Sequence, residues 1–193
     1  MRKITISLGA TAAAGVLLFV GLSPASAETV DSTISGGSLT STVSGAALSG
    51  VTLDGSNTQV ATGTATDWTI TDARGTGEAW SLSVSATDLT SAAGTVETAA
   101  RTIAVSQLSV TPGTVTADAG ADAATGISAA AVTLSTTGQS LISSAGSHKG
   151  TYTVSGSTFD LAIPANAYRS NWSGAVDTST LNPYVSTVTF TIG

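Results

Sequence analysis

Residues able to carry out chemistry are few in this chain. It has one histidine, no cysteine and twelve acidic residues in a length of 193. The histidine, His148, lies in Gly-Ser-His-Lys-Gly, so a glycine stands on each side of it within two residues. General acid–base catalysis needs positioned partner groups, and the sequence shows none around His148. We therefore predict an exposed loop histidine without a catalytic role.

The carboxylates do not form a recognisable catalytic or metal-binding group. Glycosidases need two carboxylates at a fixed separation around the scissile bond, and the acidic residues here are scattered. Asp118 and Asp122 lack the alternating oxygen ligands of a calcium loop. Asp67, Asp72 and Glu78 flank a strand that contains a tryptophan, where such acids commonly accept turn hydrogen bonds. We predict no catalytic residue, no metal site and no cofactor.

Aromatic side chains are the best candidates for binding, because flat rings stack against sugars. The candidates are its three tryptophans and three tyrosines: Trp68, Trp80, Trp172, Tyr152, Tyr168 and Tyr184. Trp172 and Tyr168 lie in the polar segment 167–174, a setting typical of an exposed ring with a polar handle. These two are the predicted glycan contacts. Trp80 and Trp68 each share a strand face with aliphatic residues and are expected in the core.

The amino terminus has the parts of a secretory signal. Arg2 and Lys3 come first, an apolar stretch covers 12–22, and an Ala-x-Ala cleavage site ends at Ala27. A membrane anchor is the weaker alternative, because polar residues interrupt the stretch. We predict a signal peptide over residues 1–27 and one β domain over residues 28–193, a length sufficient for a hydrophobic core.

Removal of this signal would leave a strongly acidic chain. Four basic residues then remain against twelve acidic ones, which gives a formal charge of −8. So little positive charge cannot neutralise a phosphate backbone, and nucleic acid is excluded as a partner. Regularly spaced aliphatic and aromatic residues distinguish the chain from a disordered one.

Alternation of apolar and polar residues recurs along the chain and predicts strands. The clear cases are Trp68–Ile70, Trp80–Ala86, Phe159–Ile163 and Val188–Ile192, and the weaker ones are Ser38–Val43, Ala47–Leu53, Thr102–Leu108, Ala131–Leu134 and Thr151–Val154. Many short strands with glycine-rich breaks between them favour an all-β fold, a single antiparallel β-sandwich with Greek-key or barrel-like connections. Residues 117–131 are compatible with either a short helix or a long loop.

Two of these strands carry a recognisable pattern. In the first, Trp80-Ser-Leu82 follows the turn Asp-x-Arg-Gly-x-Gly of residues 72–77. In the second, Tyr184 is followed by three variable residues, an aliphatic residue, a threonine and then Phe190-Thr-Ile192. Together they resemble the two signatures of the WxL family of Gram-positive surface proteins, with Phe190 and Ile192 in place of a tryptophan and a leucine. The resemblance extends from roughly Ser38 onward.

The resemblance implies a secreted, non-enzymatic protein of the cell wall or cell surface that binds peptidoglycan. It also implies other exported WxL proteins and membrane-anchored surface proteins as partners. The end of the chain shows no sorting motif for covalent attachment, so we expect the association to be non-covalent. Two other classes remain open. One is a structural subunit or adhesin domain that binds protein or host ligands through its β-sandwich, and the other is an uncharacterised cell-wall hydrolase.

Overall fold

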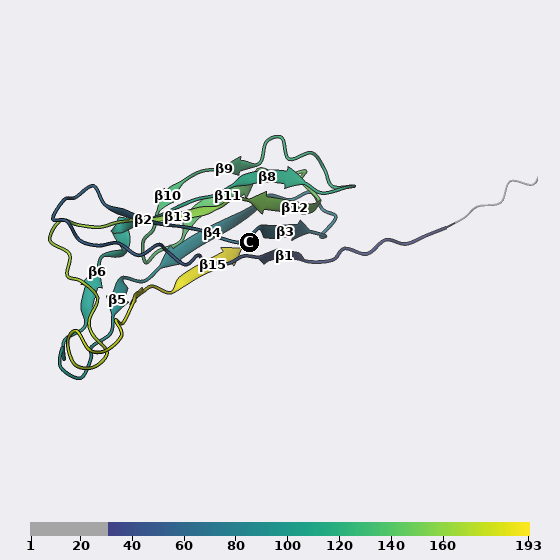
Figure 1. Ribbon diagram of the computed structural model, residues 1–193. Coiled ribbons are helices and arrows are strands. Elements are labelled where there is room, and N and C mark those ends of the chain that lie inside the picture. The colour runs from purple at the N-terminus through teal and green to yellow at the C-terminus, as the bar shows by residue number, and fades with distance from the viewer. Residues whose placement is uncertain (1–30) are drawn as a thin grey trace, which may run out of the picture. The chain divides into compact units, whose positions relative to one another are not determined.

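The computed structural model describes residues 31–193, so the predicted signal peptide lies outside the described residues. Residues 31–38 have no regular structure, and Ser35–Gly193 form one compact unit (Figure 1). Its strands pair antiparallel throughout and build four small sheets. The sheets form a sandwich-like arrangement, which confirms the predicted all-β antiparallel class. Across residues 31–193, no helix has the length and apolar character needed to cross a membrane.

Strands distant in the sequence are neighbours in every sheet. The first sheet contains, in spatial order, β1 (Leu39–Thr42), β3 (Trp68–Asp72), β12 (Gly150–Ser155) and β8 (Thr114–Ala117). The second contains β10 (Val132–Thr133), β7 (Leu108–Thr111), β13 (Thr158–Ala162) and β2 (Val60–Thr64). The third contains β15 (Val188–Ile192), β4 (Trp80–Ala86), β11 (Gln139–Ser144) and β9 (Ser128–Ala129). The fourth contains β14 (Tyr184–Val185), β5 (Leu89–Ser91) and β6 (Arg101–Ile103), and a short 3-10 helix (Val105–Gln107) leads from β6 to β7.

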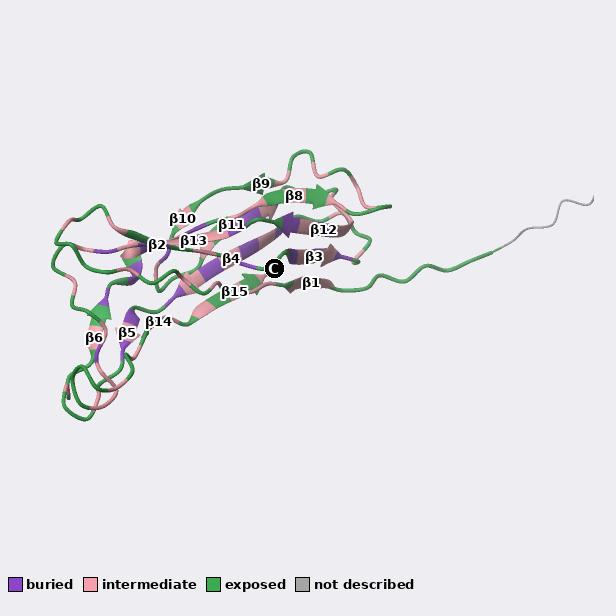
Figure 2. Cartoon of the chain, in the orientation of Figure 1, coloured by how far each residue is buried: buried purple, intermediate pink, exposed green. Residues whose placement is uncertain are grey.

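The core lies between strands that bury alternate side chains, as Figure 2 shows for β4. Trp68 and Trp80 are both buried, as the alternation predicted, and the Trp68 ring lies edge-on to Phe159 and Phe190. The Trp80 ring lies 6.2 Å from that of Tyr152. Aromatic pairs at such spacings add stabilisation beyond the area they bury. Trp68 and Trp80 thus contribute two of the largest side chains of the core.

The clear sequence-predicted strands are present, but two of the weaker ones are not as expected. Ala47–Leu53 is wrong, because the segment forms no strand. The segment lies beside β2 and is joined to it by a hydrogen bond from the Ser49 N–H to the Thr62 carbonyl. Thr102–Leu108 is interrupted by the 3-10 helix, whose first N–H, that of Val105, donates to the Asp88 carboxylate.

The structure defines two further segments: residues 117–131, for which the sequence allowed a helix or a loop, and β11, which the sequence pattern did not predict. Beyond the last residue of β8, residues 117–131 form a long loop that contains only β9, and no helix. The central strand β11 buries the consecutive residues Leu141 and Ile142, and its register with β4 shifts between Ser140 and Ile142. A bulge places successive side chains on one face and so removes the alternation by which strands are detected.

Candidate functional site

The two signature strands lie side by side at the edge of the third sheet. β15 pairs with β4, which sets Phe190 opposite Val84 and Ile192 opposite Leu82. The pair is closed by hydrogen bonds in both directions between Ser81 and Gly193. Leu82 is fully buried, whereas Phe190 and Ile192 are half-buried and pack against the core. The signature residues of both strands therefore form packing contacts.

The turn before β4 is held together by one arginine. The Arg74 guanidinium donates from Nε and Nη2 to the two carboxylate oxygens of Asp72, at 3.0 and 2.9 Å, and also donates to the carbonyls of Glu78 and Ala79. Asp72 is buried, and Arg74 holds the pKa of its carboxyl below the usual range. Gly75 and Gly77 have positive φ angles that suit glycine. The Asp-x-Arg-Gly-x-Gly motif thus fixes the direction in which the chain enters β4.

His148 is not the exposed loop residue that the sequence predicted. The residue is half-buried, and both ring nitrogens have partners: Nδ1 lies 2.6 Å from the Ser144 hydroxyl and Nε2 lies 3.0 Å from the Thr125 carbonyl. A carbonyl only accepts, so Nε2 carries a proton, and in the neutral ring Nδ1 accepts from the Ser144 hydroxyl. Ser144 is buried and also accepts the Gly146 N–H. The serine–histidine pair therefore closes a loop and presents no accessible nucleophile.

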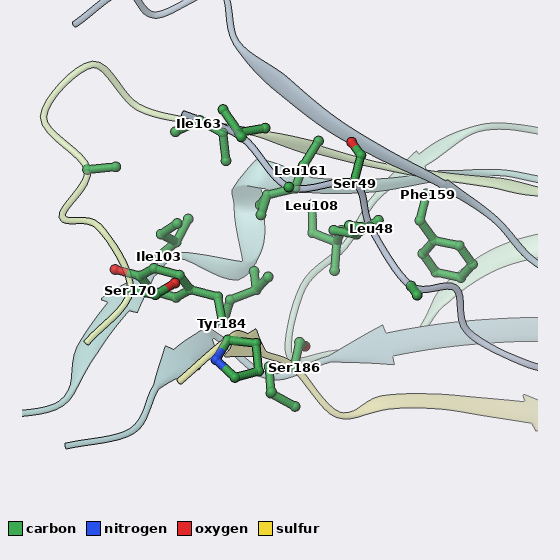
Figure 3. A pocket seen from close by; sticks show the side chains of 18 of the residues that line it. Leu48, Ser49, Ile103, Leu108, Phe159, Leu161, Ile163, Ser170, Tyr184 and Ser186 are labelled. Carbon is green, nitrogen blue, oxygen red and sulfur yellow. The ribbon is translucent and has the colours of Figure 1, made fainter. Parts of the chain in front are cut away.

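A groove of about 1310 Å³ lies next to the fourth sheet. Its floor is apolar and comes from several elements: Leu89, Ile103, Leu108, Phe159, Leu161 and Ile163. Figure 3 shows Leu48, Leu108 and Leu161 gathered in this space, so the segment wrongly predicted as a strand forms one wall. Binding sites for ligands are commonly concave and apolar, with a few polar groups for orientation. The groove has this character.

The polar side of the groove is formed by the segment 167–170, with Ser186 and Tyr184 nearby (Figure 3). Tyr168, a predicted glycan contact, is 69 % exposed and lines the groove. The Arg101 guanidinium lies 5.1 Å from the centre of the Tyr168 ring, and the Tyr184 hydroxyl donates to the Tyr168 carbonyl. Burial raises the pKa of the Tyr184 hydroxyl, which stays a neutral donor. The tyrosine ring is thus held in place by its neighbours.

Within residues 31–193, the only charged side chains that line the groove are Arg101 and Arg169. Both donate to the same carboxylate, that of Glu97, at 3.0 Å from Arg101 and 2.7 Å from Arg169. The Trp172 backbone N–H and the Arg169 guanidinium hold the pKa of the Glu97 carboxyl below its usual range. Two fixed positive charges therefore share one negative charge.

Trp172, the second predicted glycan contact, does not line the groove. It is half-buried, and the Arg169 guanidinium lies 5.5 Å from the centre of its ring. Its indole N–H is buried without a hydrogen-bond partner within residues 31–193. The structure therefore brings Tyr168 to the groove and places Trp172 behind Arg169. A buried N–H without a partner is unusual, because it costs free energy comparable to a lost hydrogen bond.

Sequence reasoning did not identify the two arginines as site residues. Arg101 and Arg169 are separated by more than sixty residues, and neither lies in a recognisable motif. One signal was available. Only four basic residues follow the predicted signal, and Arg74 stands in a signature turn while Lys149 stands beside the single histidine. The remaining two are those of the groove.

A family model matches residues 31–169, and its description is WxL domain, surface cell wall-binding. The chain belongs to the WxL family. The matched region contains Trp80, Tyr168 and both groove arginines, whereas the second WxL signature, at residues 184–192, lies beyond it. No curated protein and no solved structure matches the chain. As a WxL protein, it carries a cell wall-binding surface domain.

The groove of this WxL domain is suited to binding. Aromatic and guanidinium groups surround an apolar floor, and no carboxylate lines it among the described residues. Over the same part of the chain, no cluster of three or more His, Cys, Asp or Glu side chains is placed to hold a metal ion. The arrangement offers a stacking surface, hydrogen-bond donors for an anion and contact area for apolar groups.

Proposed function

We propose that the protein is exported and associates non-covalently with cell-wall peptidoglycan, as a non-enzymatic binding module whose ligand occupies the groove. On this proposal residues 1–27 are removed as a signal peptide, and residues 28–193 act as a single domain. The observation that carries the proposal is the lining of the groove, in which Tyr168 and two arginines border an apolar floor. The cell wall-binding description of the WxL family supports the same function.

The lining also favours binding over hydrolysis. Glycoside hydrolysis uses a pair of carboxylates on either side of the scissile bond. The charged residues that line the groove are two arginines, and the nearby Glu97 is held by both of them. A carboxylate whose pKa is lowered, here by the Trp172 N–H and by the Arg169 guanidinium, is a poor general acid at neutral pH.

Sedimentation with purified sacculi tests the proposal. The wild-type protein is expected to pellet with sacculi stripped of teichoic acid and protein, and to be released by denaturant without digestion of the wall. Tyr168→Ala is expected to weaken pelleting without lowering the melting temperature, because Tyr168 is largely exposed. Val60→Ala is the matched control, since Val60 is also an exposed apolar residue but does not line the groove.

Three results would contradict the proposal. Wild-type protein that stays in the supernatant would exclude wall binding under these conditions. Equal loss of pelleting in the Tyr168 and Val60 variants would place the contact outside the groove. Release of reducing ends from wall fragments by the purified protein would show a hydrolase.

A further inference from the structure

The groove differs in charge from the rest of the molecule. The whole chain carries twelve acidic and six basic residues, yet the two charged residues that line the groove are both arginines. Elsewhere the cations of the compact unit are matched by acids of their own. Arg74 is paired with Asp72 and Glu78, and Lys149 with Asp122. At the groove, Arg101 and Arg169 share Glu97. The groove therefore has an excess of one positive charge.

The guanidinium groups have donors left for a ligand. An arginine has five N–H donors. Arg101 donates to Glu97 and to the Arg169 carbonyl, and Arg169 donates to Glu97 and to the Ser170 carbonyl. The side chain of Arg169 is 42 % exposed, so a ligand in the groove can reach its remaining N–H groups. A guanidinium binds a carboxylate through two parallel hydrogen bonds, a planar match that a neutral sugar hydroxyl does not offer.

The floor selects against a bare sugar as the main occupant. Leu108, Phe159 and Leu161 are buried hydrophobic residues that form the base, and Leu48 adds a wall. The volume of about 1310 Å³ exceeds the usual range of small-ligand pockets, roughly 300–1,000 Å³. A chain of several units with small apolar groups and at least one carboxylate complements both this floor and the arginines. Among wall components, the peptide stems have this chemistry, whereas the glycan backbone is dominated by hydroxyl and amide groups.

We propose that the groove binds an acidic peptide stem of peptidoglycan, with a peptide carboxylate on Arg169 and the apolar part of the peptide on the floor. Tyr168 lies between this groove and a second hollow of about 420 Å³, which Arg101 also lines, so its exposed ring marks the place where an attached sugar would leave the groove. Arg101 is a positioning residue, because it donates to the Arg169 carbonyl at 2.7 Å and packs on Tyr168. This inference rests on the proposed wall-binding function and names the part of the wall that is bound.

Titration calorimetry with the purified wild-type protein tests the inference without any variant. The probes are peptide stems released from sacculi by an amidase, the same stems with their carboxyl groups methyl-esterified, and the peptide-free glycan strands. We expect the free-acid stems to bind roughly ten-fold or more tightly than the esters, since a hydrogen bond to a charged group contributes about 1.5–3 kcal/mol. Equal affinity for acid and ester, or tighter binding of the glycan strands, would overturn the inference.

Two variants assign the carboxylate to its partner. Arg169→Gln is expected to bind the free-acid stems as weakly as wild type binds the esters, and to have lost the preference for the acid. Lys149→Gln removes the same charge from a residue that lines neither hollow, and it is expected to keep that preference. An equal loss in both variants would mean that net charge alone acts, and the assignment to Arg169 would fail.

The peptide preference is separable from wall binding itself. If the protein sediments with sacculi but binds acid and ester stems equally, the proposed wall-binding function stands and the inference about the peptide stem is wrong. If the protein prefers the free-acid stems in solution but does not sediment with sacculi, the peptide site stands and the proposed wall association is wrong.

Discussion

Tryptophan is used in opposite ways in two regions of this protein. In the signature region, defined as β4, β15 and the turn 72–79, Trp80 is buried and its N–H donates to the His148 carbonyl. In the groove region, defined as the fourth sheet, the groove beside it and the segment 167–174, Trp172 is half-buried and its N–H has no partner within residues 31–193. The first region pairs its polar groups, and the second leaves some unpaired.

Charge follows the same division. The buried Asp72 accepts a two-point contact from the guanidinium of Arg74, which also pairs with Glu78. In this turn two carboxylates therefore share one cation. In the groove region one carboxylate serves two arginines. Incomplete pairing weakens a fold and leaves groups available to a ligand, which is why perturbed and underpaired polar groups gather at functional sites. The family signature thus maintains the fold, and we expect binding in the groove region.

The largest expected effect belongs to the core of the signature region. Trp80→Ala removes a buried ring and leaves a cavity, so we expect the free energy of unfolding to fall by about 3–5 kcal/mol. Urea denaturation followed by circular dichroism measures it. Trp80→Phe, which keeps an aromatic ring, is expected to lose less. An unchanged free energy of unfolding in Trp80→Ala, together with abolished wall binding, would make Trp80 a contact residue and reverse the roles of the two regions.

A smaller effect is expected from the charge pair of the signature turn. Asp72→Asn leaves the Arg74 guanidinium without its two-point acceptor, and we expect a loss of about 1–3 kcal/mol of stability. Asp122→Asn is the control, because the Asp122–Lys149 pair is more than 40 % exposed on both sides and exposed pairs contribute little to stability. If urea denaturation shows equal losses of stability for the two variants, the buried Asp72–Arg74 pair stabilises the fold no more than the exposed pair does.

The same pair predicts a dependence on pH. The pKa of Asp72 is lowered in the folded protein by Arg74, so the folded state binds fewer protons than the unfolded one around the usual pKa of an aspartate. Its stabilisation is complete above that value, about 4, and is lost as the pH falls through the lowered pKa. The difference in melting temperature between wild type and Asp72→Asn is therefore expected to shrink from pH 7 to pH 2. A difference that stays constant over this range would contradict the assignment.

The smallest expected effect is at Trp172. Trp172→Phe keeps a flat ring beneath Arg169 and removes the buried N–H that has no partner within residues 31–193. Removing an unpaired polar group is nearly neutral or stabilising, so we expect the free energy of unfolding to change by less than about 1 kcal/mol. Urea denaturation decides it. A loss of stability well above that value would mean that the indole N–H does have a partner. The two regions would then not differ in how they pair the N–H of their tryptophan.

Much of the fold could be predicted from local pattern. Alternation identified β3, β4, β13 and β15, because each of these strands buries every second residue more deeply. Where the pattern failed, a particular geometry is responsible. The bulge in β11 put Leu141 and Ile142 together in the core, and the apolar residues of Ala47–Leu53 line a groove instead of forming a strand. Apolar residues on the wall of a groove resemble those of a strand, because both are partly withdrawn from water.

The candidate site was less predictable than the fold. Tyr168 was identified because a polar segment around a ring predicts exposure, and the structure shows it exposed. Trp172 has the same surroundings in sequence but is half-buried, because Arg169 covers its ring. Arg101 and Arg169 meet at Glu97 only through the pairing of β5 with β6 and the return of the segment 164–183. Contacts of this kind depend on tertiary structure and leave no trace in local spacing.

The division between a fold-maintaining signature and a binding groove can be tested by mapping the bound ligand. Amide chemical shifts of the isotope-labelled protein, followed during titration with soluble wall fragments, locate the ligand residue by residue. We expect the largest changes at Tyr168, Arg169 and the Arg101 end of β6, with the signature strands almost unchanged. Largest changes along β4 and β15, around the serines and threonines of their outer face, would contradict this division, because the signature would then be the binding surface.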